Sequence, residues 1–80
     1  MQAEKVLSNN KVKRWLGNQT KCDLCHIPFS DIEWFADAFC RTLRQWAIVC
    51  PECHAENTSG RFGTGIGQKY DATTKIKLAG

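Results

Sequence analysis

Two C-x-x-C pairs constrain this chain more than any other feature of its sequence. The first pair occupies residues 22–25, and the second occupies residues 50–53 after a spacer over 26–49. Each pair can wrap one edge of a tetrahedral ion, so two pairs supply a complete four-thiolate site. The spacer is somewhat longer than the roughly 15–20 residues usual between such pairs, and a β-hairpin would take up the excess. We predict one structural zinc ion with the ligands Cys22, Cys25, Cys50 and Cys53.

The cysteine count also raises alternatives to a metal site. Five cysteines in a chain of 80 residues could form disulfides or stay free, and a domain this small often needs such support for its core. The odd count, the paired spacing and a leader without an apolar signal segment argue against disulfides. No apolar run approaches membrane-spanning length. We therefore expect a cytoplasmic protein with no membrane partner, whose thiolates are free to bind metal.

Two histidines and the fifth cysteine each have more than one possible role. His26 and His54 each follow a pair directly, which also matches the C-x-x-C-H signature of c-type haem attachment. Since no export signal or second axial ligand is evident, we favour positions near the sulfurs or at the surface, with replacement of a cysteine ligand as the other option. Cys40 fits a small buried hydrophobic residue, because a reactive thiol would need a neighbouring base.

Local patterns predict a helix followed by a hairpin in the first half of the chain. Apolar residues at helical spacing predict a helix over 3–16, which Gly17 would end. Residues 32–39 and 42–49 are rich in aromatic and branched side chains, which indicates two antiparallel strands with a turn near Cys40.

The second half is predicted to hold one short helix and irregular segments. Pro51 suits a first helical turn, and residues 57–60 would end that helix. Residues 60–70 hold most of the glycines, so we predict a loop that either packs across the zinc site or cradles a phosphate. The segment 71–80 is polar, and we expect either a last short strand or a flexible basic tail.

The aromatic residues of the predicted hairpin have two interpretations. They could pack the hairpin onto the zinc site, which we favour because so small a domain needs core side chains. They could instead form stacking platforms for nucleic-acid bases. The four residues concerned are Trp34, Phe35, Phe39 and Trp46.

Positive charge gathers toward both ends of the chain. The net charge is +3, and the middle of the chain, which holds the cysteines, is slightly acidic. Basic ends of this kind indicate contact with an anionic partner, with solvated termini as the alternative. We predict nucleic-acid binding, mainly through phosphates, by Lys11, Lys13, Arg14, Arg61, Lys69 and Lys75.

Two segments together resemble a known group of proteins. Residues 46–54 read W-A-I-V-C-P-E-C-H, and residues 63–70 read G-T-G-I-G-Q-K-Y. Over about residues 20–70 the chain resembles small phage-encoded zinc-ribbon or treble-clef proteins with these features. The resemblance implies the same four cysteine ligands, a phage or prophage setting and no defined reaction. Cys40 and the residues before the glycine run depart from the group's pattern.

These observations combine into one prediction for fold and function. We expect a small α+β zinc-stabilised domain of zinc-ribbon or treble-clef type, with a hairpin between the two cysteine pairs. Its segments are an N-terminal helical segment (1–19), the zinc domain with its glycine-rich loop (20–70) and the tail (71–80). We expect no enzymatic activity, because neither a Walker-type ending nor an H-N-H-like nuclease run is present. The alternative function is a module that binds a host protein, with Trp15 and Leu16 of the predicted helix as its contact.

Overall fold

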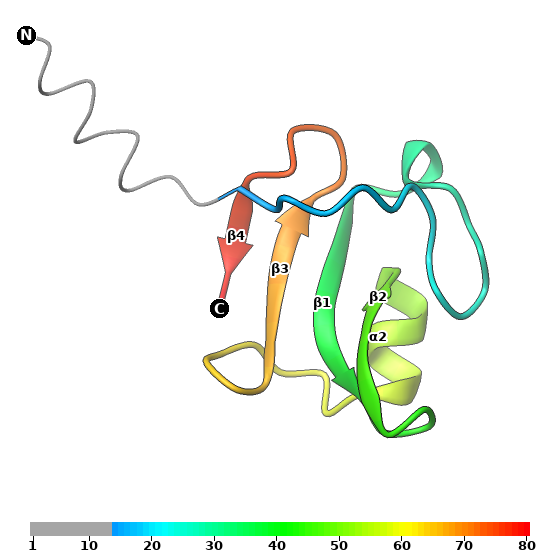
Figure 1. The fold of residues 1–80 in the computed structure, drawn as a ribbon, viewed down its shortest axis with the longest axis vertical. Coiled ribbons are helices and arrows are strands. Elements are labelled where there is room, and N and C mark those ends of the chain that lie inside the picture. Colours follow the sequence, from blue (N-terminus) through cyan, green and yellow to red (C-terminus); the bar gives the residue numbers. More distant parts are fainter. Residues whose placement is uncertain (1–13) are drawn as a thin grey trace, which may run out of the picture.

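The computed structural model describes residues 14–80, and its centre is a four-stranded antiparallel sheet (Figure 1). The strands lie in the order β2-β1-β3-β4, so β1 is an inner strand. One short 3-10 helix precedes the sheet, and one α-helix follows the hairpin. In chain order the elements are η1 (Phe29–Asp31), β1 (Trp34–Cys40), β2 (Gln45–Val49), α2 (Pro51–Asn57), β3 (Gly67–Asp71) and β4 (Lys77–Ala79).

The predicted hairpin is confirmed, with strands shorter than expected at their first residues. β1 and β2 pair in a register that places Ala38 opposite Ala47 and Phe39 opposite Trp46. The turn covers 41–44, where Arg44 has a φ of 58°. This left-handed conformation lets a short turn reverse the chain between the two strands.

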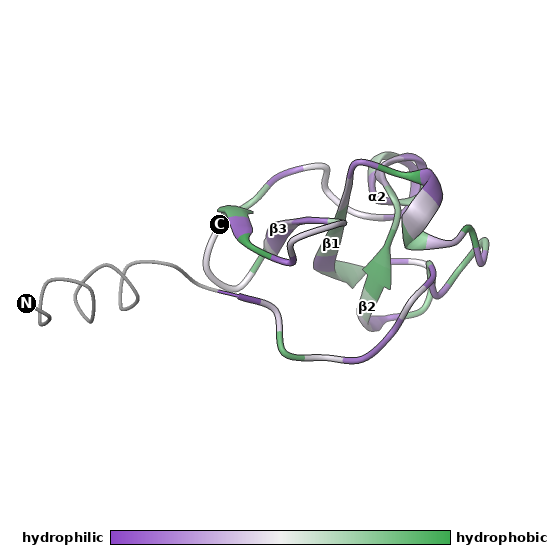
Figure 2. Cartoon of the chain, turned by 90° about the horizontal axis from the view of Figure 1, so that it is seen from above, coloured by the Kyte–Doolittle hydropathy of each residue, from purple (hydrophilic) through white to green (hydrophobic). Residues whose placement is uncertain are grey.

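The alternation of side chains along β1 divides the core into two layers. Successive residues of a strand point to opposite faces. On one face Ala36, Ala38 and Cys40 join the three buried cysteines of the two pairs, Cys22, Cys50 and Cys53, in a single cluster. On the other face Phe35 packs with Phe29 in a second cluster. Figure 2 shows α2 on one side of the sheet and the segment that follows Arg14 on the other side.

The small side chains on the first face explain how the helix can approach the sheet closely. β1 places alanine at positions 36 and 38 there, and β2 adds Ala47 and Val49, all of them buried. α2 contacts both strands. Larger residues at these positions would push α2, and with it the second cysteine pair, away from the first pair.

The prediction of a loop over 60–70 is wrong for its last four residues, which belong to β3. Gly67 lies opposite Ala38 of β1, and a Cβ atom on Gly67 would lie only 2.9 Å from the Cβ of Ala38. Glycine therefore permits close pairing of two strands here rather than a free loop. Gly63 and Gly67 form an isolated bridge that closes the preceding turn.

A last short strand, one of the two expectations for the segment 71–80, is confirmed as β4. β4 pairs with β3 through Lys69 opposite Ala79 and Tyr70 opposite Lys77. The turn before β4 is held by the Asp71 carboxylate, which accepts hydrogen bonds from the backbone of Thr73 and Thr74.

The predicted helix over 3–16 lies mostly outside the described residues. Its last three residues, 14–16, are not helical, because Arg14 forms a bridge with Ile76 and the Trp15 backbone N–H donates to the Lys75 carbonyl at 2.9 Å. Trp15 packs edge-on against Phe35, with ring centroids 5.0 Å apart. Over residues 14–80 no helix is long and apolar enough to cross a bilayer.

Candidate metal centre

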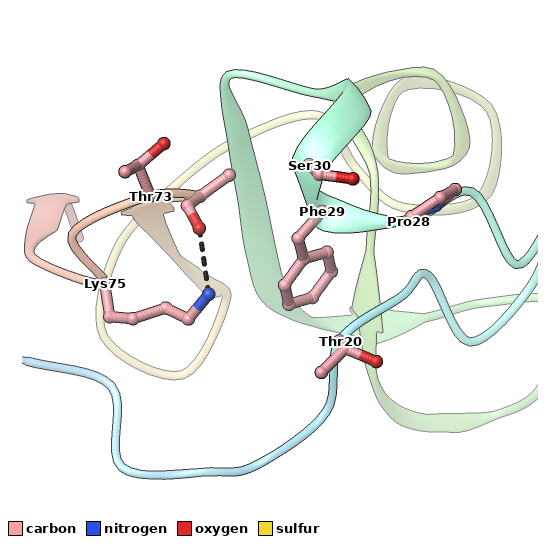
Figure 3. Close-up of a pocket in the computed structure, with 7 residues that line it drawn as sticks. Thr20, Pro28, Phe29, Ser30, Thr73 and Lys75 are labelled. Carbon is pink, nitrogen blue, oxygen red and sulfur yellow. Dashed lines mark hydrogen bonds between the residues drawn. The ribbon is translucent and has the colours of Figure 1, made fainter.

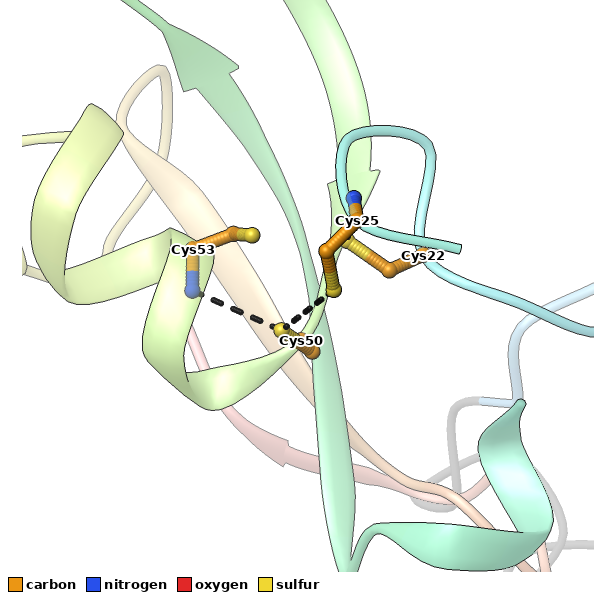
Figure 4. A group of neighbouring side chains, drawn as sticks. All are labelled: Cys22, Cys25, Cys50 and Cys53. Atoms are coloured by element: carbon orange, nitrogen blue, oxygen red, sulfur yellow. Dashed lines mark hydrogen bonds between the residues drawn. The ribbon is translucent and has the colours of Figure 1, made fainter. Parts of the chain in front are cut away.

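The four cysteines of the two pairs converge on one point (Figure 4). Their sulfur atoms all lie within 4.8 Å of one another, and the Sγ atoms of Cys25 and Cys50 are 3.6 Å apart. Four sulfurs at about 2.3 Å from a tetrahedral zinc ion would be about 3.8 Å from one another. The donor set and its spacing therefore fit one zinc ion bound by Cys22, Cys25, Cys50 and Cys53.

The first pair is shaped as a tight turn, here called the first knuckle (residues 22–26). The backbone N–H groups of Leu24 and Cys25 point at the Cys22 sulfur, at 3.3 and 3.5 Å. His26 has a φ of 67°, and its N–H donates to the Cys22 carbonyl at 3.0 Å. The N–H groups of Leu24 and Cys25 orient the Cys22 sulfur and favour its thiolate form.

Asp23 connects the first knuckle to the hairpin. Its carboxylate accepts a hydrogen bond from the Ile48 N–H at 2.9 Å, and its own N–H donates to the Ile48 carbonyl at 2.8 Å. Both bonds use backbone groups on the outer edge of β2. They fix the distance between the first cysteine pair and the end of β2, where the second pair begins.

The second pair is positioned by the start of α2. Cys50 is the N-cap residue, and its sulfur accepts a hydrogen bond from the Cys53 N–H at 3.4 Å. Pro51 occupies the first turn, where its missing N–H costs nothing. The predicted helix after the second pair is thus confirmed, and it holds both sulfurs on one side of its first turn.

The acidities of the thiols differ with their surroundings. Burial raises the pKa of the Cys22 thiol, but the backbone N–H groups of Cys25, Cys50 and Leu24 outweigh it and lower the pKa to about 7. Burial is the main cause that raises the pKa of Cys50 and of Cys53. Four sulfurs this close can all be thiolates only when a cation compensates their charge, which a bound zinc ion would do.

The five cysteines differ in burial, and none of them is in a disulfide. Cys22, Cys50 and Cys53 are buried and Cys25 is exposed. All five cysteines are free, so the alternative of structural disulfides is not supported. Cys40 is fully buried in the same cluster as the ligands but lies outside the four-sulfur group, as predicted for a small hydrophobic residue.

The two histidines have different environments, and neither belongs to the four-sulfur group. His26 is exposed on the first knuckle. His54 is only 3% exposed and stacks on Phe62, with ring centroids 4.6 Å apart. Burial, and then the nearby Lys69 ammonium, lower the pKa of His54. Because the thiols gather around one point, the arrangement favours one ion over two haem groups.

Stacking of His54 on Phe62 was not predicted from the sequence. The Trp34 ring packs edge-on against both of these rings, with its centroid 5.6 Å from that of His54 and 5.8 Å from that of Phe62. The Nε2 atom of His54 is buried without a hydrogen-bond partner. No local signal marks Phe62, since its place beside α2 depends on the path of the whole segment after the helix.

The predicted phosphate contacts that fall within residues 14–80 do not form one surface. Lys11 and Lys13 lie outside the described residues. Arg14 and Lys75 are brought together by the bridge between Arg14 and Ile76. Lys69 lies over the Trp34 ring at 4.7 Å, on the face of the sheet opposite to Phe35. Arg61 is exposed on the segment between α2 and the glycine turn.

Lys75 lines a pocket between the N-terminal segment, η1 and the turn before β4 (Figure 3). Its ammonium donates to the Ala72 carbonyl at 2.8 Å and lies 5.0 Å from the centroid of the Phe29 ring. The cavity has a volume of about 440 Å³. Its remaining polar groups are the hydroxyls of Thr20, Ser30 and Thr73.

Comparisons of this chain with family models, with characterised proteins and with solved structures found no match. The assignment of function therefore depends on the chain's own residues, and the resemblance to small phage zinc proteins stays a prediction.

Proposed function

We propose that the chain is a zinc-stabilised, non-enzymatic module that binds nucleic acid. The observation that supports contact with an anionic partner is the position of Lys75. Its ammonium lines an open pocket with three hydroxyl groups, and Arg14 lies beside it on the adjoining segment. A cation with neighbouring hydroxyls suits a phosphate oxygen, and such contacts supply most of the affinity in non-specific binding.

The proposed zinc ion has a structural role. All four positions of a tetrahedral ion would be filled by sulfur, so no position is left for a water or substrate. We assign the module to the treble-clef type, which a knuckle, a hairpin and a helix with two ligands in its first turn support. The phage origin and the cytoplasmic location are further predictions from the sequence.

Salt-dependent binding tests the proposed function. We expect the affinity of the zinc-loaded protein for a short duplex to fall steeply between about 50 and 200 mM salt. The double variant R14Q/K75Q should bind more weakly and reduce the slope of log K against log salt by roughly two. Lys21→Gln, which removes one exposed charge elsewhere on the N-terminal segment, serves as the control. An affinity that stays flat with salt would reject nucleic-acid binding.

Binding of a protein partner is the second candidate, and one observation favours it. Leu16 is 92% exposed although it is a large apolar residue. Trp15, predicted as its partner in this contact, packs instead against Phe29 and Phe35. If this candidate is correct, a stoichiometric partner captured from nuclease-treated lysate should be lost in Leu16→Ala and retained in Lys21→Gln.

A further inference from the structure

Two aromatic side chains stand out because they are exposed next to each other on the sheet. Phe39 of β1 and Trp46 of β2 are directly opposite in the strand pairing. They are 41% and 44% exposed, whereas the other aromatic side chains are either buried or only partly exposed. The prediction that all four hairpin aromatics pack onto the zinc site is therefore right only for Trp34, because these two are exposed and Phe35 packs in the second cluster on the other face.

The rings are exposed because only one end of this sheet face is covered. Phe35 lies on the same face of β1, four residues before Phe39, and there Trp15 and Phe29 pack over it. Over residues 14–80 no aromatic contact reaches Phe39 or Trp46 in the same way. Directly opposite residues of an antiparallel pair have Cβ atoms about 4.5–5.5 Å apart, so the two side chains project from neighbouring positions of this face, and together they are here called the platform.

A groove lined in part by an arginine side chain adjoins this platform. It has a volume of about 340 Å³ and is lined by Phe39, Arg41, Ser59, Gly65 and Ile66. Arg41 is held in place from two directions. Its backbone N–H donates to the Asn57 carbonyl at 2.7 Å, and its guanidinium donates to the Thr58 carbonyl at 2.9 Å.

Charge around the platform favours an anionic occupant. The hairpin turn over 41–44 carries Arg41 and Arg44 and no acidic residue. The acid on the platform's face of β1 is Asp37, which lies on the side away from the turn. A phosphate chain would therefore run along the turn side of the platform, past both guanidiniums, rather than over Asp37.

We propose that the hairpin surface, made of Phe39, Trp46, Arg41 and Arg44, binds single-stranded nucleic acid. Unpaired bases stack on the two rings, and the phosphates between them lie at the guanidiniums. Every base has a flat π-face, so such stacking depends little on sequence, whereas the paired bases of a duplex are not available for it. This inference depends on the proposed nucleic-acid binding and adds the form of the strand and the surface that takes it.

The test compares single and double strands on the zinc-loaded protein. Fluorescence anisotropy is measured with three labelled probes: 12-nucleotide oligo(dT), 12-nucleotide oligo(rU) and a 12-base-pair DNA duplex. The double variant F39A/W46A should bind the single strands at least tenfold more weakly and bind the duplex as before. Leu43→Ala, which removes an equally exposed apolar side chain from the same turn, should change nothing.

Two further variants separate stacking from a general loss of structure. Trp46→Phe keeps a flat ring, so it should retain most of the affinity but lose the quenching of tryptophan fluorescence that a stacked base causes. Arg41→Gln should reduce the slope of log K against log salt for the single strands by about 0.7. Because the rings are exposed, the ring variants should keep one zinc ion and the wild-type circular dichroism. Arg41→Gln loses the hydrogen bond to the Thr58 carbonyl, so its zinc content and circular dichroism are compared with wild type in the same way before binding is measured.

The possible outcomes distinguish failure of this inference from failure of the proposed nucleic-acid binding on which it depends. If the wild-type protein binds single strands and F39A/W46A binds them equally well, the hairpin surface is not the site and nucleic-acid binding still holds. Equal losses for single strands and duplex would also overturn stacking. If the wild-type protein binds none of the three probes, the proposed function itself fails. A preference between oligo(dT) and oligo(rU) identifies the strand as DNA or RNA.

Discussion

The sulfur atoms of Cys25 and Cys50 lie 3.6 Å apart, although 25 positions separate the two residues in the sequence. Two separate supports produce this approach. Asp23 fixes the first knuckle to β2 by two hydrogen bonds with Ile48, and the first turn of α2 holds the second pair. Each support positions two sulfurs, and a shared ion would join them.

Removal of the metal should therefore unfold the domain. Zinc binding to such sites contributes apparent free energies on the order of 10 kcal/mol in zinc-finger peptides, and a domain of this size has little other stability. We expect native mass spectrometry to show one zinc ion. A strong chelator at neutral pH should abolish the circular dichroism of the fold, and added zinc should restore it. A chelated protein that kept its fold would contradict the structural role of the metal.

Substitution of Cys25 and of Cys40 should have different effects on zinc binding, because we expect only Cys25 to be a zinc ligand. Cys25→Ser removes a ligand at an exposed position, so we expect the variant to give up zinc to a chelator concentration that the wild-type protein withstands. Cys40→Ala removes a buried sulfur outside the four-sulfur group. It should lower stability by roughly 1–2 kcal/mol and keep one zinc ion. Equal zinc loss in both variants would show that the site depends on packing rather than on these ligands.

The metal site could be predicted from sequence because its information is local. Each C-x-x-C pair needs only a few consecutive residues, and Pro51 marks the helix that carries the second pair. The hairpin was visible in the same way, through its run of aromatic and branched side chains. What joins these parts, such as the bonds between Asp23 and Ile48, has no local pattern.

The division of the hairpin aromatics could not be predicted, because it depends on distant segments. Phe35 and Phe39 share one face of β1, and alternation alone treats them alike. Phe35 is buried because Trp15 and Phe29 pack over it and Tyr70 stacks beside it. The prediction of a loop over the whole glycine run is wrong for a related reason, since the Ala38 side chain on the neighbouring strand requires glycine at position 67.

Gly67→Ala should test that close approach directly. The added methyl group would meet the Cβ of Ala38 at 2.9 Å, and overpacking of this kind typically costs about 1–3 kcal/mol. Denaturant unfolding of the zinc-loaded protein measures the loss. The double variant G67A/A38G makes room for the methyl group, so it should lose less than the sum of the two single variants. If the losses in unfolding free energy of the two single variants simply add in the double variant, there is no steric clash between positions 38 and 67.

Asp37→Asn should stabilise the folded protein at neutral pH. Burial, and then the charge of Asp23, raise the pKa of the Asp37 carboxyl above its ordinary 3.8. A carboxyl whose pKa is higher in the folded than in the unfolded state opposes folding when it is ionised, and this cost disappears as the pH falls through the folded-state pKa. The amide cannot ionise, so the variant should have the higher unfolding midpoint in urea at pH 7.

The difference between Asp37→Asn and wild type should shrink as the pH is lowered, since the wild-type carboxyl then takes up its proton. Unfolding is measured with excess zinc at each pH, because acid also protonates the thiolates of both proteins and removes the metal from them. Asp31→Asn, at an exposed position in η1, serves as the control that changes net charge equally. A midpoint for Asp37→Asn that falls below wild type at neutral pH would mean that the ionised carboxylate stabilises the fold.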